Sequence, residues 1–365
     1  MQRDERIAVL LSGGVDSSTA LWRLKQQGYR NLHAYYLKIW LEDELSFLGE
    51  CPWEEDLRFA REVCETAGVP LDVVPLQLEY YERVVQYAIA ELRRGRTPSP
   101  DIFCNQRIKF GAFFDTVQES ADRVATGHYA RVLREGHADA EGAQSGPVRL
   151  FQAPDPVKDQ TYFLSHLSQE QLAHAVFPIG EMHKDDVRRA AHELNLPNKD
   201  RKDSQGICFL GNIKYPEFVK YYLGEQQGTI VEYETGRKLG EHKGFWFYTI
   251  GQRQGLGLGN GPWYVVAKEP ESNTLFVSHR SNAADRMRSD FFVKELHWIS
   301  EPATSVSDDL SVKIRHGPEK TACSVTPEEH GLRVTMSEAD RGIAPGQFAV
   351  FYRGEECLGS GRIAE

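Results

Sequence analysis

The first half of the chain alternates unbroken apolar runs with apolar residues at helical spacing. Residues 7–11 (IAVLL) are apolar without interruption, which is typical of a strand buried on both faces of a parallel sheet. The same pattern predicts three more strands, at 33–40, 71–76 and 124–128, and two helices between them, at 56–67 and 80–94. Strands that alternate with helices predict a doubly wound parallel sheet, whose ligands bind beyond the carboxyl ends of its strands.

From about residue 216 the pattern changes to short β-prone segments separated by turns. Residues 228–237 (GTIVEYETGR) predict a hairpin that turns at Thr235 and Gly236, and the aromatic run 245–250 (FWFYTI) predicts a strand. Further short strands, typical of a small barrel or sandwich, are predicted at 310–315, 332–336 and 347–352. We therefore expect an α/β domain followed by two small β-rich domains, with boundaries at 1–215, 216–284 and 285–365.

Composition narrows the class of protein. At 365 residues the chain is long enough for two or three domains. It contains no stretch of about 18 apolar residues, so we expect no membrane partner. The first residues, MQRDER, lack the apolar region of a secretory signal, which favours a cytoplasmic location, or an organellar one if a transit peptide precedes them. The net charge of −10 is a poor match for RNA, although local clusters of basic residues permit nucleic-acid binding.

The pattern of cysteines predicts one or two reactive thiols rather than a disulfide framework. None of the six forms a C-x-x-C pair or a zinc-binding spacing with histidine, so we expect neither a metal site nor a disulfide framework. Cys51, Cys64, Cys323 and Cys357 are interpreted as ordinary structural residues.

Cys104 and Cys208 have unusual neighbours. Prolines 98 and 100 predict a loop around Cys104, whose thiol pKa Arg107 and Lys109 could lower. Asp101 offers a carboxylate three residues before this cysteine. Cys208 lies between two glycines in a polar loop.

The most informative motif is Ser12–Ser17 (SGGVDS), directly behind the first predicted strand. Two glycines let the backbone turn sharply, Ser17 and Ser18 can cap a following helix, and Gly28 is placed to end it. A strand, a glycine turn and a helix N-terminus together form an anion site. The motif is not a Walker A loop, because no lysine follows its glycines.

SGGVDS resembles the loop of the PP-loop ATP pyrophosphatases, which cleave ATP between the α and β phosphates. Further segments make the resemblance more specific: PSPDIFCN (98–105), KDQTYFL (158–164), DSQGICFLG (203–211), GQRQGLG (251–257) and APGQ (344–347). Taken in order, they resemble the signature set of the tRNA-specific 2-thiouridylase family over nearly the whole chain. The resemblance implies an adenine nucleotide α-hydrolase-like fold for the first domain.

The resemblance also implies an activity: ATP-dependent 2-thiolation of the wobble uridine of tRNA. The C2 oxygen of uracil would be adenylated, and sulfur from a cysteine persulfide would then replace it, giving 2-thiouridine, AMP and pyrophosphate. Cys208 would carry the persulfide and Cys104 would be the nucleophile that closes a transient disulfide with it. Asp101 would be the general acid or base.

Binding residues follow from the same resemblance. ATP would be contacted by Leu10, Leu11, Ser12, Gly13, Gly14, Val15, Asp16, Ser17, Leu37 and Gly127. The tRNA would be contacted, at its anticodon stem-loop, by Ser99, Pro100, Asp101, His128, Lys158, Asp159, Gln160, Arg315, His316 and Gln347. Asp16 would position Mg²⁺ or the pyrophosphate. The remaining partner would be a persulfide donor such as a cysteine desulfurase or a sulfur-relay protein.

Three residues depart from the family pattern: Ser99 replaces asparagine, Leu37 replaces methionine and His316 replaces tyrosine. Residues 42–55 read as an insertion. Two alternatives remain open from the residues. A PP-loop ligase or amidotransferase acting on a small metabolite would explain SGGVDS but not the paired cysteines. A non-catalytic RNA-binding protein that keeps an ATP fold would bind tRNA without releasing pyrophosphate.

Overall fold

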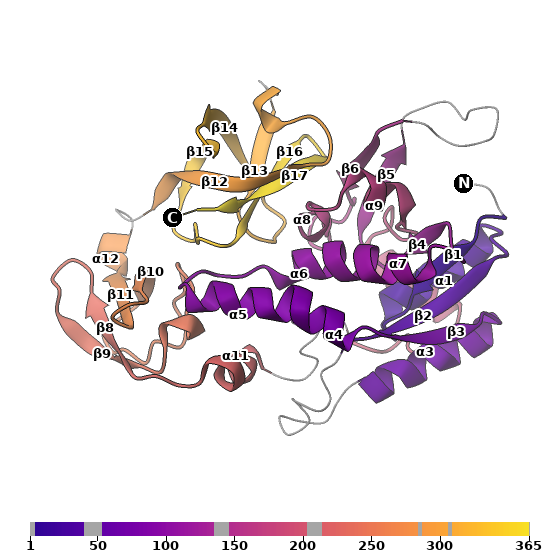
Figure 1. Ribbon diagram of the computed structural model, residues 1–365, viewed down its shortest axis with the longest axis horizontal. Helices are drawn as coiled ribbons and strands as arrows, with labels where there is room; N and C mark the ends of the chain where they lie inside the picture. The colour runs from indigo at the N-terminus through magenta and orange to yellow at the C-terminus, as the bar shows by residue number, and fades with distance from the viewer. Residues whose placement is uncertain are drawn as a thin grey trace.

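The computed structural model describes residues 4–39, 53–134, 146–202, 214–283, 287–305 and 309–364. Figure 1 shows a parallel sheet near the N-terminus, a smaller sheet formed by residues of the middle of the chain, and a barrel that ends the chain. The long helical segment ending in α5 (Gln86–Arg93) runs between the first two of these. No helix within the described ranges is long and apolar enough to cross a membrane.

The first sheet is parallel throughout and follows the order β3-β2-β1-β4-β7. Its strands are β1 (Ile7–Leu10), β2 (Leu32–Lys38), β3 (Leu71–Pro75), β4 (Arg123–Ala125) and β7 (Ala175–Val176). In its register Ile7 lies opposite Leu32 on one side and Arg123 on the other. The strands predicted at 7–11, 33–40, 71–76 and 124–128 are therefore present, with ends that differ by a few residues.

Both faces of this sheet are covered, as the unbroken apolar run of β1 predicts. Ile7, Val9 and Leu11 pack on one face with α1 (Val15–Gln26) and α3 (Trp53–Ala67). Ala8 and Leu10 pack on the other face, in the core that also holds the helical segments between β3 and β4. Helices on both faces confirm the doubly wound architecture.

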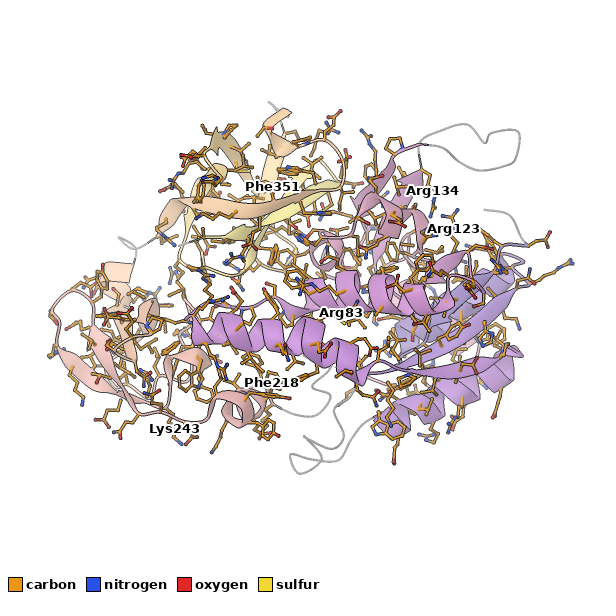
Figure 2. The ribbon with its side chains drawn as sticks, viewed as in Figure 1. Arg83, Arg123, Arg134, Phe218, Lys243 and Phe351 are labelled. Atoms are coloured by element: carbon orange, nitrogen blue, oxygen red, sulfur yellow. The ribbon has the colours of Figure 1, made fainter. Side chains whose placement is uncertain are left out.

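The predicted helix 80–94 is longer than expected and contains a π-helical turn. The helical segments between β3 and β4 are α4 (Gln77–Tyr80), η2 (Tyr81–Val85), α5 (Gln86–Arg93), α6 (Pro100–Phe103), η3 (Cys104–Ala112) and α7 (Phe113–Val117). Those that follow β4 are α8 (Thr161–Leu164), α9 (Gln169–His174), α10 (Lys184–Glu193) and α11 (Tyr215–Leu223). Phe218 of α11, labelled in Figure 2, is fully buried and joins the core against α5.

The middle sheet has the order β10-β11-β8-β9. Its strands are β8 (Gly228–Glu232), β9 (Lys238–His242), β10 (Trp263–Glu269) and β11 (Thr274–His279), followed by α12 (Arg280–Ala283). The hairpin predicted at 228–237 is confirmed by the antiparallel β8–β9 pair, with Gly236 at a φ of 71°. The strand predicted at 245–250 is wrong: residues 245–247 form a 3₁₀ turn, η4 (Phe245–Phe247), because Phe245 and Trp246 turn inward to the core beneath α5.

The C-terminal strands close into an antiparallel barrel, because β17 pairs with both β16 and β12. The elements are β12 (Arg288–Trp298), η6 (Ala303–Ser305), β13 (Leu310–Lys313), β14 (Thr321–Glu328), β15 (Gly331–Asp340), β16 (Phe348–Arg353) and β17 (Glu356–Ile363). Phe351, labelled in Figure 2, lies in the barrel core. The short strands predicted in this region are confirmed as β13, β15 and β16.

A hairpin from the first part of the chain extends the barrel sheet. It consists of β5 (Ala130–Arg134) and β6 (Val148–Gln152), and β6 pairs with β17 through Leu150 opposite Cys357. Figure 1 shows this hairpin between the barrel and the parallel sheet. The sequence pattern did not predict this pairing between strands that are distant in the chain.

Candidate active site

The loops after β1 and β4 meet at the point where the strand order reverses. The chain runs from β1 through β2 to β3 on one side, and continues at β4 and β7 on the other side of β1. In open α/β sheets this switch point is where a ligand binds. The structure therefore brings the SGGVDS loop together with Gly127, as the resemblance implies, while Leu37 lies half-buried near the carboxyl end of the neighbouring β2.

Two glycines of this site have no room for a side chain. Gly13 has a φ of 72°, and a Cβ on it would collide with the backbone of Asp56. A Cβ on Gly127 would lie 2.7 Å from the amide nitrogen of Ser17 and 2.8 Å from the carbonyl carbon of Asp16. The backbone after β4 thus touches the first turn of α1.

Replacing Gly127 by alanine should therefore weaken ATP binding by at least about tenfold, because the first turn of α1 must shift. Isothermal titration calorimetry with ATP would measure this. Gly259→Ala is the matched control, since a Cβ on Gly259 meets nothing within 4 Å. Equal ATP affinity in Gly127→Ala and the wild type would contradict the prediction.

Internal hydrogen bonds hold the SGGVDS loop. Helix α1 begins at Val15 with Gly14 as its N-cap, so the expectation that Ser17 and Ser18 cap it is wrong. Their hydroxyls instead donate to the Gly14 carbonyl, at 3.1 and 3.0 Å. The buried Asn198 side chain donates to the Gly13 carbonyl at 2.8 Å and to the Ser18 hydroxyl at 2.9 Å.

A lysine distant in sequence reaches the loop. The ammonium of Lys184, the first residue of α10, lies 2.7 and 2.9 Å from the two carboxylate oxygens of Asp16. The Tyr129 hydroxyl also donates to Asp16, at 2.7 Å. Sequence reasoning missed Lys184, because no motif that we interpreted includes it.

The prolines predicted a loop around Cys104, but the structure places this cysteine in a helical segment. Pro100 begins α6, Cys104 begins the π-helical segment η3, and the cysteine is only 1% exposed. Arg107 contacts the Phe103 ring, 3.8 Å from its centroid, and donates to the Arg83 carbonyl at 2.8 Å. Burial also lowers the pKa of the Arg107 guanidinium. Asp101 lies on α6, one turn before Cys104.

Cys208 and the rest of the segment 203–211 lie outside the described residues, as does Cys51. The chain that leads to Cys208 is nevertheless fixed at Arg201. Its guanidinium donates to the Gly13 carbonyl at 3.1 Å and forms an ion pair with Asp56. Burial raises the pKa of Asp56, although Arg201 opposes this shift. The described chain therefore reaches the SGGVDS loop at Arg201, seven residues before Cys208.

The residues expected to face RNA fall into two groups by burial. His128 is buried, its Nδ1 lies 2.7 Å from the Thr126 hydroxyl, and burial together with Lys109 places its pKa well below the usual range. It is therefore neutral, with little surface for an RNA contact. Ser99, Asp101, Lys158 and Gln160 are half-buried. Pro100 is buried at the start of α6.

Asp159 corrects the expectation most clearly. Its side chain is 0% exposed and accepts hydrogen bonds from Gln152 and Thr161, both at 2.9 Å. It also forms an ion pair with Lys313 of β13, 3.1 Å away and likewise fully buried. A side chain with no exposed surface does not contact RNA in this conformation. The pair instead joins the segment 158–160 to the barrel.

The Asp159 backbone also contacts the Arg315–His316 segment. The His316 ring donates from Nε2 to the Asp159 carbonyl oxygen, 3.1 Å away, and stacks on Phe163, with ring centroids 4.6 Å apart. His316, which stands where the family has tyrosine, thus makes a stacking contact, and its partner is Phe163 of the same chain. Arg315 lies half-exposed and forms a bidentate pair with Asp340, at 2.9 and 2.6 Å.

Arg315 and Gln347 line one cavity of about 370 Å³ between the barrel and the middle domain. Its other lining residues are Thr249, Ile250, Gly251, Met287, Asp340, Arg341 and Gly342. The APGQ turn that carries Gln347 also holds the segment before Cys104, because the Thr97 amide donates to the Pro345 carbonyl at 2.8 Å. The Thr97 and Thr249 hydroxyls are 3.3 Å apart. Three regions of the chain thus meet beside Ser99.

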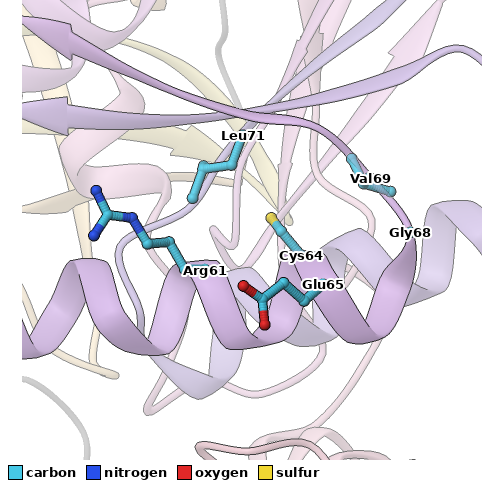
Figure 3. A pocket seen from close by; sticks show the side chains of 6 residues that line it. All are labelled: Arg61, Cys64, Glu65, Gly68, Val69 and Leu71. Carbon is cyan, nitrogen blue, oxygen red and sulfur yellow. The ribbon is translucent and has the colours of Figure 1, made fainter.

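A second hollow, of about 270 Å³, has no relation to these residues. Figure 3 shows it between α3 and β3, lined by Arg61, Cys64, Glu65, Gly68, Val69 and Leu71. Burial raises the pKa of the Cys64 thiol to about 12. This cysteine packs in the core, as expected of a structural residue.

Comparison with known proteins defines the class. Three family models match in succession: "tRNA methyl transferase HUP domain" over residues 5–212, "tRNA methyl transferase PRC-barrel domain" over 216–279 and "Aminomethyltransferase beta-barrel domain" over 288–363. The fold and these matches define a nucleotide-loop α/β domain followed by two β-barrel domains.

Curated relatives define the family. The chain is 44% identical to tRNA-specific 2-thiouridylase MnmA 2 of Bacteroides fragilis over 362 residues, covering 98% of this chain and 99% of that one. It is 45% identical to tRNA-specific 2-thiouridylase MnmA 1 of Bacteroides thetaiotaomicron, over the same shares of both chains. It is 42% identical to tRNA-specific 2-thiouridylase MnmA of Porphyromonas gingivalis, covering 98% of this chain and 99% of that one. The chain belongs to the tRNA-specific 2-thiouridylase family.

Proposed function

We infer that this chain is a tRNA-uridine 2-sulfurtransferase. It uses ATP to activate the C2 oxygen of the wobble uridine and replaces that oxygen by sulfur. Family membership over nearly the full length supports this function, and nothing in the matches above supports a ligase acting on a small metabolite. The observation that supports the assignment of residues is the contact of Arg201 with the Gly13 carbonyl, because Arg201 precedes Cys208 by only seven residues.

Adenylation is the step we assign to the switch point. The backbone amides of Ser12–Ser17 and the N-terminus of α1 favour phosphate oxygens. The C2 oxygen attacks the α-phosphorus, a bond between them forms, and the bond to the β-phosphate bridge breaks. AMP is now attached to the base as a good leaving group. The wobble base must leave the anticodon stack to reach this point, as loop bases of RNA can.

Sulfur transfer is the step we assign to the two cysteines. The Cys104 thiolate attacks Sγ of a Cys208 persulfide, a disulfide between the two cysteines forms, and the terminal sulfur leaves with the electron pair as hydrosulfide. The hydrosulfide adds to C2 and AMP leaves with the former C2 oxygen. A thiol reductant must reduce the disulfide before the next turnover. Because Cys104 is 1% exposed, the residues that cover it must move aside for this step.

Positions around Cys104 suit this role. Asn105 donates to the Phe163 carbonyl at 3.0 Å, which fixes the start of η3 to the KDQTYFL segment. We assign Asp101 as the acid or base near the uracil, since it lies one helical turn from Cys104. Ser99, Lys158, Gln160, Arg315 and Gln347 are proposed RNA contacts because each keeps exposed surface.

Mg²⁺ fits the site in one respect. Mg²⁺ in proteins is usually held by one or two carboxylates together with substrate phosphates. The Asp16 carboxylate, which also pairs with Lys184, would supply such a ligand, while no group of three or more His, Cys, Asp or Glu side chains suited to a metal occurs among the described residues. The ion would reduce the negative charge of the triphosphate. Sulfur would come from a persulfide donor such as a cysteine desulfurase.

Nucleoside mass spectrometry tests the function directly. Unmodified tRNA is incubated with the protein, a cysteine desulfurase, cysteine, Mg²⁺ and ATP, and a parallel reaction omits ATP. We expect ATP-dependent 2-thiouridine at the wobble position with AMP and pyrophosphate in equal amounts. Pyrophosphate release without any thiouridine would contradict the assignment, and tRNA binding without pyrophosphate release would indicate the non-catalytic alternative.

A further inference from the structure

The nucleotide loop lacks a positive charge of its own. A Walker A loop carries a lysine that reaches the phosphates, but SGGVDS has none and adds the negative charge of Asp16. ATP and the pyrophosphate that leaves it are strongly anionic. Phosphoryl-transfer sites rely on cations placed around the phosphates. A cation is therefore expected to reach this loop from another part of the chain.

Lys184 is placed to be that cation. It begins α10, 168 residues after Asp16, and its ammonium lies 2.7 and 2.9 Å from the Asp16 carboxylate oxygens. Its backbone is also fixed, because its amide donates to the Asp155 carboxylate at 3.0 Å. The Lys184 side chain is 12% exposed and the Asp16 side chain 32% exposed, so the pair lies at the rim of the loop rather than inside the core.

We propose that Lys184 binds the pyrophosphate part of ATP and is a catalytic residue of the adenylation step. When the bond between the α-phosphorus and its bridging oxygen breaks, the electron pair moves onto the departing pyrophosphate. The Lys184 ammonium stabilises that developing charge through hydrogen bonds to its oxygens. Asp16, together with the Tyr129 hydroxyl, is a positioning residue that holds the ammonium beside the loop.

A purely structural pair is the competing explanation. Partly exposed ion pairs contribute little to stability, so stability gives little reason for this one. The location of the pair also favours a role in anion binding, because the Asp16 carboxylate belongs to the first turn of α1, whose amides face the anion site. This inference rests on the use of ATP at this loop, as proposed above.

Calorimetric titration of the full chain with inorganic pyrophosphate and, separately, with AMP tests the proposal. In Lys184→Met we expect roughly a 10- to 100-fold loss of pyrophosphate affinity, because a charge-assisted hydrogen bond is removed. AMP affinity and the thermal unfolding midpoint should stay near their wild-type values. Lys184→Arg should keep most of the pyrophosphate affinity. Lys243→Met is the control, since Lys243 is a surface lysine of the middle domain, labelled in Figure 2.

Three results would overturn the proposal. One is unchanged pyrophosphate affinity in Lys184→Met, and another is an equal loss for pyrophosphate and AMP with a lowered unfolding midpoint. The third is a wild-type chain that binds no pyrophosphate. A wild type that binds ATP and pyrophosphate but makes no 2-thiouridine would instead refute the assigned function and leave the role of Lys184 at the anion site intact.

Discussion

Cys208→Ser should abolish the formation of 2-thiouridine from a persulfide donor, while ATP- and tRNA-dependent pyrophosphate release continues. Serine cannot carry sulfane sulfur, whereas the adenylation step needs neither cysteine. Cys104→Ser should also lose thiouridine formation, by roughly a thousandfold or more, because residues that act as one catalytic unit are each indispensable. Unlike Cys208→Ser, it should still accept sulfur, and the Cys208 peptide should gain the mass of one sulfur atom after incubation with a cysteine desulfurase.

Control variants distinguish a loss of catalysis from a loss of folded protein. Cys323→Ser changes a half-buried thiol of β14 and should leave thiouridine formation unchanged. Because Cys104 is buried, Cys104→Ala is measured beside Cys104→Ser, and both should unfold at temperatures near that of the wild type. Full thiolation by either Cys104 variant, or a sulfur adduct on Cys208→Ser located at Cys104, would reverse or remove the assigned roles.

Lys313→Met should destabilise the protein by about 3–5 kcal/mol, because it leaves the Asp159 carboxylate buried without its ion-pair partner. Both side chains are 0% exposed, so water cannot replace the lost charge. Urea denaturation followed by circular dichroism would measure the free energy of unfolding.

The double variant Asp159→Asn/Lys313→Met provides the internal comparison. It removes both charges, and we expect it to recover most of the stability that Lys313→Met loses. Lys294→Met, on the exposed side of β12, should change the free energy of unfolding by less than about 0.5 kcal/mol. A Lys313→Met protein as stable as the wild type would show that Asp159 is not held as a buried carboxylate.

Local pattern was sufficient to predict the parallel sheet. The unbroken apolar run at 7–11 requires cover on both faces, and residues 7, 9 and 11 indeed pack in a different core from residues 8 and 10. Gly13 of the SGGVDS loop and Gly127 mark the edge of the sheet where backbone segments approach closely, which is a local requirement for glycine.

Proline and aromatic signals were weaker guides. Pro98 and Pro100 predicted a loop, yet Pro100 begins α6, the position at which proline is tolerated because its missing amide hydrogen is not needed. The aromatic run at 245–250 has the composition of a strand. Burial of Phe245 and Trp246 under the first domain decides its conformation instead, and that contact is not encoded in the run itself.

Long-range pairs were beyond sequence reasoning. Asp159 lies in a motif that resembles an RNA-contacting segment, and only its partner Lys313, 154 residues later, shows that its side chain is internal. Lys184 likewise has no local sequence signal, because its role follows from a contact with Asp16, which is distant in sequence. In both cases the role of one charged residue can be inferred only when its partner in the folded structure is known.

The pairing of β6 with β17 has a consequence for biosynthesis. The β5–β6 hairpin emerges from the ribosome long before its partner, since β6 ends at residue 152 and β17 begins only at residue 356. Until then the outer edge of β6 has no strand to pair with, and an open edge is a template for association with other chains. The segment that follows this hairpin carries Lys158–Gln160, and its Asp159 also awaits Lys313. A nascent chain that stops before β17 therefore leaves this edge of β6 without its partner strand.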